Sequence, residues 1–119
     1  MKRILVADDD AMFRTIVKRH LNRMGFEVIE NESGKGVVDQ IRQHRPVACL
    51  IDLVMDGKEG IETIEEIAGI AHRPKVVAVS SNAKYLDFAT GLGADTSLLK
   101  PVSPESLRSA LDRVGIVPD

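Results

Sequence analysis

The sequence predicts an α/β domain built on a parallel β-sheet, and two observations carry this prediction. Short apolar, β-branched runs alternate with longer stretches in which apolar residues recur at helical spacing. The central short runs are rich in Val, Ile and Leu and hold few polar residues, as expected of strands that are buried on both faces of a sheet. Strict alternation of strand and helix forms βαβ units, whose strands are parallel and whose crossovers are right-handed. We therefore expect a three-layer, doubly wound sheet.

Each predicted strand is a short run of four or five residues that contains β-branched or other apolar side chains. Such runs are too short for independent helices and are separated by polar or glycine-containing segments. The predicted strands are residues 3–7, 27–31, 47–51, 75–79 and 96–99.

A helix is predicted after each strand, because apolar residues there recur every three or four positions. The predicted stripes are Phe13, Ile16, Val17, Leu21 and Met24; Val37, Val38 and Ile41; Ile61, Ile64, Ile67 and Ala68; Leu86, Ala89 and Leu92; and Leu107, Ala110, Leu111 and Val114. Gly25 and Gly93 follow the first and fourth helices as left-handed caps. Ser103 and Pro104 open the last helix as N-cap and first helical residue.

Composition indicates one small domain over residues 1–119, with no linker and, within this chain, no output domain. A formal net charge of −2 does not favour direct binding to nucleic acid. The lone cysteine, Cys49, is predicted to be a small buried hydrophobe, and a chain without an internal disulfide suits a reducing compartment. No apolar stretch is long enough to span a membrane, so we expect a cytoplasmic location.

Polar residues that carry chemistry stand where the predicted strands end. Asp8, Asp9 and Asp10 close the first strand, Asp52 the third, Ser80 the fourth and Lys100 the fifth. The carboxyl ends of parallel strands meet at one edge of the sheet, where doubly wound folds bind their ligands. Clustered carboxylates repel each other unless a positive charge lies among them. We therefore predict a single site at this edge.

The residue types in this site indicate magnesium and phosphoryl chemistry. Carboxylate oxygens suit Mg²⁺ or Mn²⁺, and the sequence has no Cys/His cluster for zinc. A lysine and a hydroxyl nearby would hold phosphoryl oxygens, and a carboxylate can attack phosphorus to form an acyl phosphate. Asp52 stands apart from the acidic triplet and is the better candidate nucleophile.

Four motifs resemble the receiver domains of two-component response regulators, over essentially the whole chain. They are residues 4–10, residues 52–60, residues 79–81, and residues 93–95 followed by Lys100-Pro101. The resemblance implies a flavodoxin-like fold with strand order 2-1-3-4-5. It also implies a signalling domain rather than an enzyme, acting through a change in the surface formed by the fourth helix, fifth strand and fifth helix.

The resemblance implies a role for each site residue. Asp52 would accept a phosphoryl group from a phosphohistidine of a sensor kinase or phosphotransfer protein. Asp8, Asp9, Asp52 and the backbone carbonyl of Val54 would hold Mg²⁺, for which Mn²⁺ could substitute. Lys100 would pair with phosphoryl oxygens, and Ser80 would close on them to carry the signal. Asp10 is instead predicted to cap a helix. The downstream target would be a protein, and the last two helices would support a monomer or a weak dimer.

The chain departs from the family pattern at two positions. Asp56 stands where the family usually has proline, and Ser97 where it usually has a switching Tyr or Phe. These departures motivate one alternative, a phosphorylation-independent interaction module on a receiver scaffold. A second alternative is a phosphatase of the haloacid-dehalogenase type, because Asp8-x-Asp10 imitates that family's nucleophile motif. The nucleophile would then be Asp8 rather than Asp52.

Overall fold

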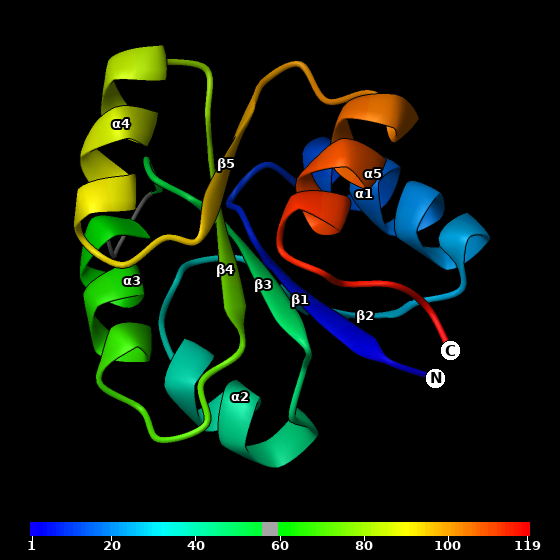
Figure 1. Ribbon diagram of the computed structural model, residues 1–119, viewed down its shortest axis with the longest axis horizontal. Coiled ribbons are helices and arrows are strands. Elements are labelled where there is room, and N and C mark those ends of the chain that lie inside the picture. Colours follow the sequence, from blue (N-terminus) through cyan, green and yellow to red (C-terminus); the bar gives the residue numbers. More distant parts are fainter. Residues whose placement is uncertain (56–59) are drawn as a thin grey trace.

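The computed structural model describes residues 1–55 and 60–119 and contains a five-stranded parallel sheet between two layers of helices (Figure 1). The strand order is β2-β1-β3-β4-β5, which confirms the predicted flavodoxin-like topology. The strands are β1 (Arg3–Ala7), β2 (Glu27–Asn31), β3 (Ala48–Asp52), β4 (Lys75–Ser80) and β5 (Thr96–Leu99).

The helices lie in two layers, α1 and α5 on one face of the sheet and α2, α3 and α4 on the other (Figure 1). Their bounds are α1 (Ala11–Met24), α2 (Val37–His44), α3 (Gly60–Ala68), α4 (Ala83–Gly91) and α5 (Pro104–Arg113). Over the described ranges, these helices are all too short or too polar to cross a lipid bilayer.

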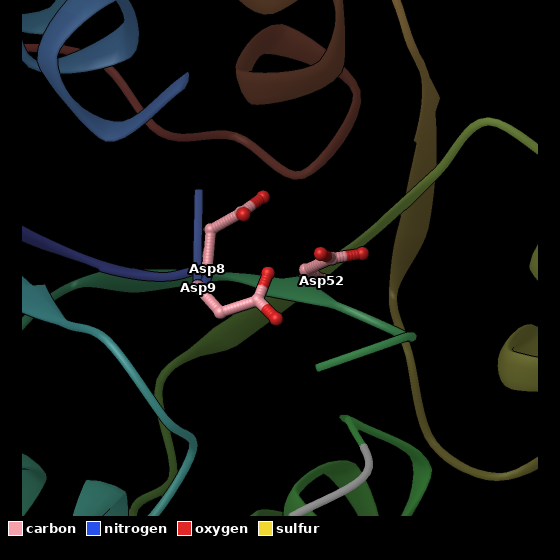
Figure 2. A group of neighbouring side chains, drawn as sticks. All are labelled: Asp8, Asp9 and Asp52. Carbon is pink, nitrogen blue, oxygen red and sulfur yellow. The ribbon is translucent and has the colours of Figure 1, made fainter. Parts of the chain in front are cut away.

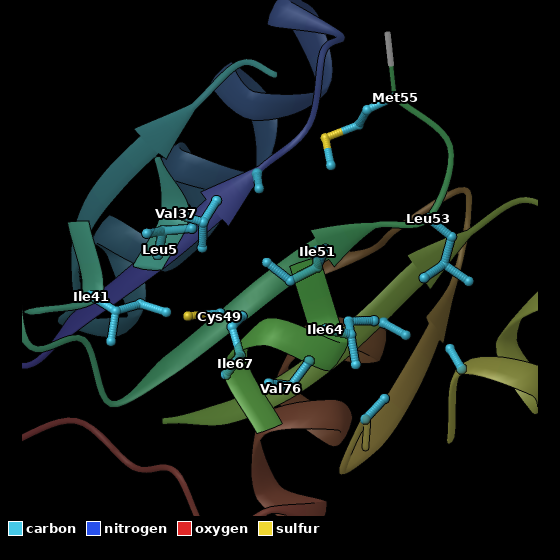
Figure 3. Close-up of a cluster of buried hydrophobic side chains, with 14 of the residues drawn as sticks. Leu5, Val37, Ile41, Cys49, Ile51, Leu53, Met55, Ile64, Ile67 and Val76 are labelled. Carbon is cyan, nitrogen blue, oxygen red and sulfur yellow. The ribbon is translucent and has the colours of Figure 1, made fainter. Parts of the chain in front are cut away.

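Alternate residues of each central strand point to opposite faces, so the sheet has two hydrophobic cores. Leu5, Cys49 and Ile51 face α2 and α3, where they pack with Ile64 and Ile67 (Figure 3). The other core lies under α1 and α5 and contains Ile4, Val6, Val17, Leu21, Leu50, Val77, Leu107 and Leu111. Cys49 is fully buried and its burial raises the thiol pKa, as expected for a small buried hydrophobe.

The predicted caps of α1 and α5 are present, whereas the cap of α4 is Leu92, with a φ of −102°, one residue before the predicted cap Gly93. Gly25 takes a left-handed φ of 101° after α1, and Gly93 has a φ of 122° shortly after α4. Ser103 caps α5 by accepting a hydrogen bond from the Ser106 amide, and Pro104 begins that helix. Asp10 caps α1, since its carboxylate accepts from the amides of Met12 and Phe13.

Several expectations need correction. Strand β3 spans Ala48–Asp52 rather than residues 47–51, and β4 ends at Ser80 rather than at residue 79. Asp52 and Ser80 are therefore the last residues of their strands and not the first residues beyond them. Ile16, predicted to lie in the buried stripe of α1, is 43% exposed, because Val17 and Leu21 already fill the contact with the sheet. Apolar spacing alone did not show how narrow the buried face of α1 is.

Candidate functional site

Three carboxylates from two neighbouring strands meet at the carboxyl edge of the sheet (Figure 2). Asp8 and Asp9 follow β1, and Asp52 ends β3, which pairs directly with β1. One oxygen from each lies within 4.8 Å of the others. Asp8 and Asp52 are buried, whereas Asp9 is exposed to solvent. The three residues therefore form an acidic site that is open on one side.

Lys100 supplies positive charge to this acidic site. Its Nζ lies 2.9 Å from Asp8 Oδ2 and 3.6 Å from Asp52 Oδ2. The ammonium group also lies 4.2 Å from the centre of the Phe13 ring, a favourable cation–π arrangement. Burial alone would lower the lysine pKa, but the Asp8 hydrogen bond and the two carboxylate charges outweigh it and raise that pKa. Lys100 is therefore firmly protonated and remains between the carboxylates.

Asp8 and Asp52 differ in how their carboxylates are held. Both oxygens of Asp8 are engaged, since Oδ1 accepts from the Asp10 amide at 2.8 Å and Oδ2 accepts from Lys100. The Asp52 carboxylate accepts one longer bond, 3.3 Å, from the Val54 amide. Burial and the nearby Asp8 charge raise the pKa of Asp52 to about 6, despite the opposing effect of Lys100. Negative charge at Asp52 is thus incompletely compensated.

The hydroxyl of Ser80 lies at the end of the adjoining strand, β4, as predicted. Ser80 is buried, and its Oγ accepts a hydrogen bond from the Asn82 amide at 3.0 Å. The Ser80 carbonyl accepts from the Lys100 amide at 2.9 Å, which joins the ends of β4 and β5. The peptide bond between Lys100 and Pro101 is cis. Ser80 and Lys100 are therefore joined by a backbone hydrogen bond, and the side chain of Lys100 reaches Asp52.

Two supporting residues escaped the sequence analysis. Arg14 of α1 donates to the Asp8 carbonyl at 2.6 Å and forms an ion pair with Glu30. Asn31 closes β2, its carbonyl accepts from the Asp8 amide, and its side-chain Oδ1 accepts from the amides of Ser33 and Gly34. Asn31 is a polar residue at the end of a strand, as Asp52 is, but β2 also contains Glu27 and Glu30 and is less apolar than β3. No comparable signal marked Arg14, one of several basic residues on α1.

The structure thus brings together the predicted Asp8, Asp9, Asp52, Ser80 and Lys100. The Val54 amide contacts Asp52, and the role of the Val54 carbonyl stays a prediction. The departure from the family pattern at Asp56 falls within residues 56–59, which lie outside the described residues. Hard carboxylate oxygens, a fixed lysine and a nearby hydroxyl are suited to holding a divalent cation and a phosphoryl group.

Known proteins share sequence and fold with this chain. A model of the "Response regulator receiver domain" family matches residues 4–112. The chemotaxis protein CheY of Thermotoga maritima is 30% identical over 116 residues, which cover 95% of this chain and 97% of that protein. A solved structure of a CheY-like receiver domain protein from Methanospirillum hungatei superposes with a TM-score of 0.86 at 26% identity, covering 96% of this chain and 93% of that one.

Longer regulators match as well. The "Probable transcriptional regulator ycf27" of Porphyridium aerugineum is 31% identical over 119 residues, which cover 95% of this chain. The match covers only 49% of that regulator, so this chain spans about half its length.

Proposed function

The chain belongs to the response regulator receiver domain family, and from this premise we propose that Asp52 accepts a phosphoryl group from a phosphohistidine on a partner kinase or phosphotransfer protein. A carboxylate oxygen of Asp52 attacks phosphorus and forms the acyl phosphate bond. The phosphorus–nitrogen bond breaks, and the imidazole nitrogen leaves with its electron pair and is then protonated. The observation that carries the proposal is that the Asp52 carboxylate lies beside Lys100 and within 4.8 Å of the Asp8 and Asp9 carboxylates.

Asp52 is a better nucleophile than Asp8 in this site. Asp8 has both oxygens in strong hydrogen bonds, one of them to a charged lysine, and it is almost completely buried. Asp52 Oδ2 is 3.6 Å from Lys100, and Asp52 Oδ1 accepts a longer hydrogen bond, of 3.3 Å, from the Val54 amide. This difference argues against the phosphatase alternative, in which Asp8 would attack phosphorus.

The acidic site fits a divalent cation, for which Mg²⁺ is the proposed occupant and Mn²⁺ a substitute. Asp8, Asp9 and Asp52 offer hard oxygen ligands, and the Val54 carbonyl is proposed as another. The pKa of Asp52 is raised first by burial and then by the Asp8 charge, and a cation would relieve the repulsion between the two carboxylates. A bound Mg²⁺ supplies charge neutralisation for the phosphoryl oxygens. Lys100 is positioned to pair with one of those oxygens.

We propose that phosphorylation is read by Ser80 and by the surface of α4, β5 and α5. A phosphoryl group adds about −1.5 to −2 charge next to Ser80, whose hydroxyl can turn from its present amide partner toward the new oxygens. Large apolar side chains are exposed on this side of the protein, at Tyr85, Phe88 and Leu99. Exposed apolar groups support signalling by contact with a downstream protein.

Residues 1–119 are proposed to act as one phosphoacceptor domain rather than as an enzyme. It would work in the cytoplasm, where its kinase would present the phosphohistidine, and its downstream target would be a protein. The proposed oligomeric state is a monomer, or a weak dimer through α4 and α5.

The test is intact-mass spectrometry after incubation with acetyl phosphate, with and without Mg²⁺. Wild-type protein should gain one phosphoryl group only when Mg²⁺ is present, and Asp52→Asn should gain none. Asp10→Asn is the matched control, because Asp10 caps α1 and asparagine caps equally well. Borohydride reduction and peptide mapping then locate the label. A label on Asp8 would support the phosphatase, and no label with no Mg²⁺ binding would support the phosphorylation-independent module.

A further inference from the structure

A second groove lies at the opposite edge of the sheet, where β3 and β4 begin. It has a volume of about 490 Å³ and is lined by the end of α2 and by the loop that leads from α3 to β4. Figure 1 shows that loop passing beside α2. The lining includes Ile41, Pro46, Ile70, Arg42, Arg45 and His72. Pro46 lies shortly before the first residue of β3, whereas Asp52 is the last residue of that strand. The groove and the phosphoacceptor site are therefore at opposite ends of this strand.

The groove combines an apolar floor with a basic rim. Ile41 and Pro46 are buried and Ile70 is half-buried, and together they make the floor of the groove apolar. Arg42, Arg45 and His72 are exposed around it. Within residues 1–55 and 60–119, no ion pair or hydrogen bond engages the side chains of these three basic residues. This contrasts with the adjacent Arg73, which pairs with Asp95 through two bonds of 3.0 Å.

Backbone conformation marks the same groove. Arg45 and His72 are the two residues other than glycine with positive φ in the described part of the chain, at 49° and 56°. Arg45 ends α2 in the left-handed position that glycine usually occupies, so a side chain there carries a conformational cost. A positive charge at Arg42 is favourable because it lies in the last turn of α2, near the negative end of the helix dipole. That interaction does not explain why Arg45 occupies a left-handed position.

We propose that this groove binds a nucleotide. The guanidinium groups of Arg42 and Arg45 match phosphate oxygens in geometry and charge, and His72 adds a donor at the rim. A planar base would pack against the apolar floor of Ile41, Pro46 and Ile70, which a simple inorganic anion would not contact. The volume lies in the range of small-molecule pockets. The two features together select a ligand with both a flat apolar part and a negative charge.

The experiment follows backbone amide shifts by NMR in the metal-free full chain, while inorganic phosphate, adenosine, guanosine, AMP and GMP are added separately. At least one nucleotide should shift the amides of Arg45 and His72 with a Kd below about 1 mM. The corresponding nucleoside and inorganic phosphate should bind at least about tenfold more weakly, because each supplies half of the interaction. Shifts confined to the Asp52 edge, equal binding of phosphate and nucleotide, or no shifts would overturn the proposal.

Arg45→Gly is the decisive variant. Glycine adopts the left-handed conformation without strain, so this variant should melt at a higher temperature than wild type while its nucleotide affinity falls at least about tenfold. A loss of binding in a more stable protein cannot be attributed to misfolding. Arg19→Gln, which removes one exposed positive charge from α1, is the control and should bind like wild type. Unchanged affinity in Arg45→Gly, or equal weakening in Arg19→Gln, would refute the assignment.

Discussion

Replacing Asp52 by asparagine should stabilise the metal-free protein at neutral pH. The pKa of Asp52 is raised from 3.8 to about 6 in the folded state, mainly by burial and then by the Asp8 charge. The folded protein therefore binds this proton more tightly than the unfolded chain does. As pH rises from about 4 to about 6, ionisation favours the unfolded chain, and the stability associated with the protonated carboxyl is lost. Asparagine has nearly the same shape and remains neutral.

The magnitude follows from the difference between the two pKa values. At about 1.4 kcal/mol for each pH unit, ionised Asp52 costs the folded protein about 3 kcal/mol above pH 6. Counterions and water at the open edge of the site reduce this cost, so we expect Asp52→Asn to gain about 1–3 kcal/mol at pH 8. At pH 4 the Asp52 carboxyl is protonated in the folded protein and is as neutral as the asparagine that replaces it, so the gain in stability should nearly vanish.

Urea unfolding at intervals from pH 4 to pH 8, with a chelator present, measures this effect. Comparing the free energy of unfolding of Asp52→Asn with that of wild type at each pH cancels the titration of other groups. Asp10→Asn is again the control and should show no such rise with pH. Equal stability of Asp52→Asn and wild type at pH 8, or a gain of the same size at pH 4, would show that the electrostatic reasoning is wrong. Adding Mg²⁺ should stabilise wild type and narrow the difference.

Three further changes have expected outcomes. Asp9→Asn should weaken Mg²⁺ binding at least about tenfold in isothermal titration calorimetry, since it removes an oxygen ligand from the acidic site. Gly60→Ala should cost about 1–3 kcal/mol in urea unfolding, because the added Cβ would overlap the backbone carbonyl of Asp52; unchanged stability would contradict this packing. Asp95→Asn should lose about 1–3 kcal/mol at pH 7, because the Arg73 pair lowers the Asp95 pKa against the opposing effect of burial. That loss should shrink as pH falls below the ordinary value of 3.8, and a pH-independent loss would contradict it.

The sequence could predict the acidic site because parallel strands have only one arrangement of their ends. Once β1, β3, β4 and β5 are recognised, their final residues must lie along one edge, whatever the strand order. The sequence could not predict that Lys100 would lie closer to Asp8 than to Asp52. Those distances depend on how the side chains pack, including the position of Lys100 over the Phe13 ring. Arg14 was hidden for a related reason. Its role depends on how α1 lies against β1, which local spacing does not determine.

Because position 97 is a serine, a signal that passes through β5 cannot use an aromatic side chain there and must use other contacts of the strand. The Ser97 carbonyl accepts from Arg113 Nη2 at 2.8 Å, and Arg113 Nε donates to Thr96 Oγ1 at 2.9 Å, so one side chain of α5 holds β5 at two successive residues. At the other end of β5, the Lys100 amide donates to the Ser80 carbonyl. A shift of Ser80 would therefore act on β5 through a backbone bond, and β5 on α5 through Arg113. This contact path needs no aromatic rotamer, so Ser97 is compatible with a phosphorylation signal that reaches α5.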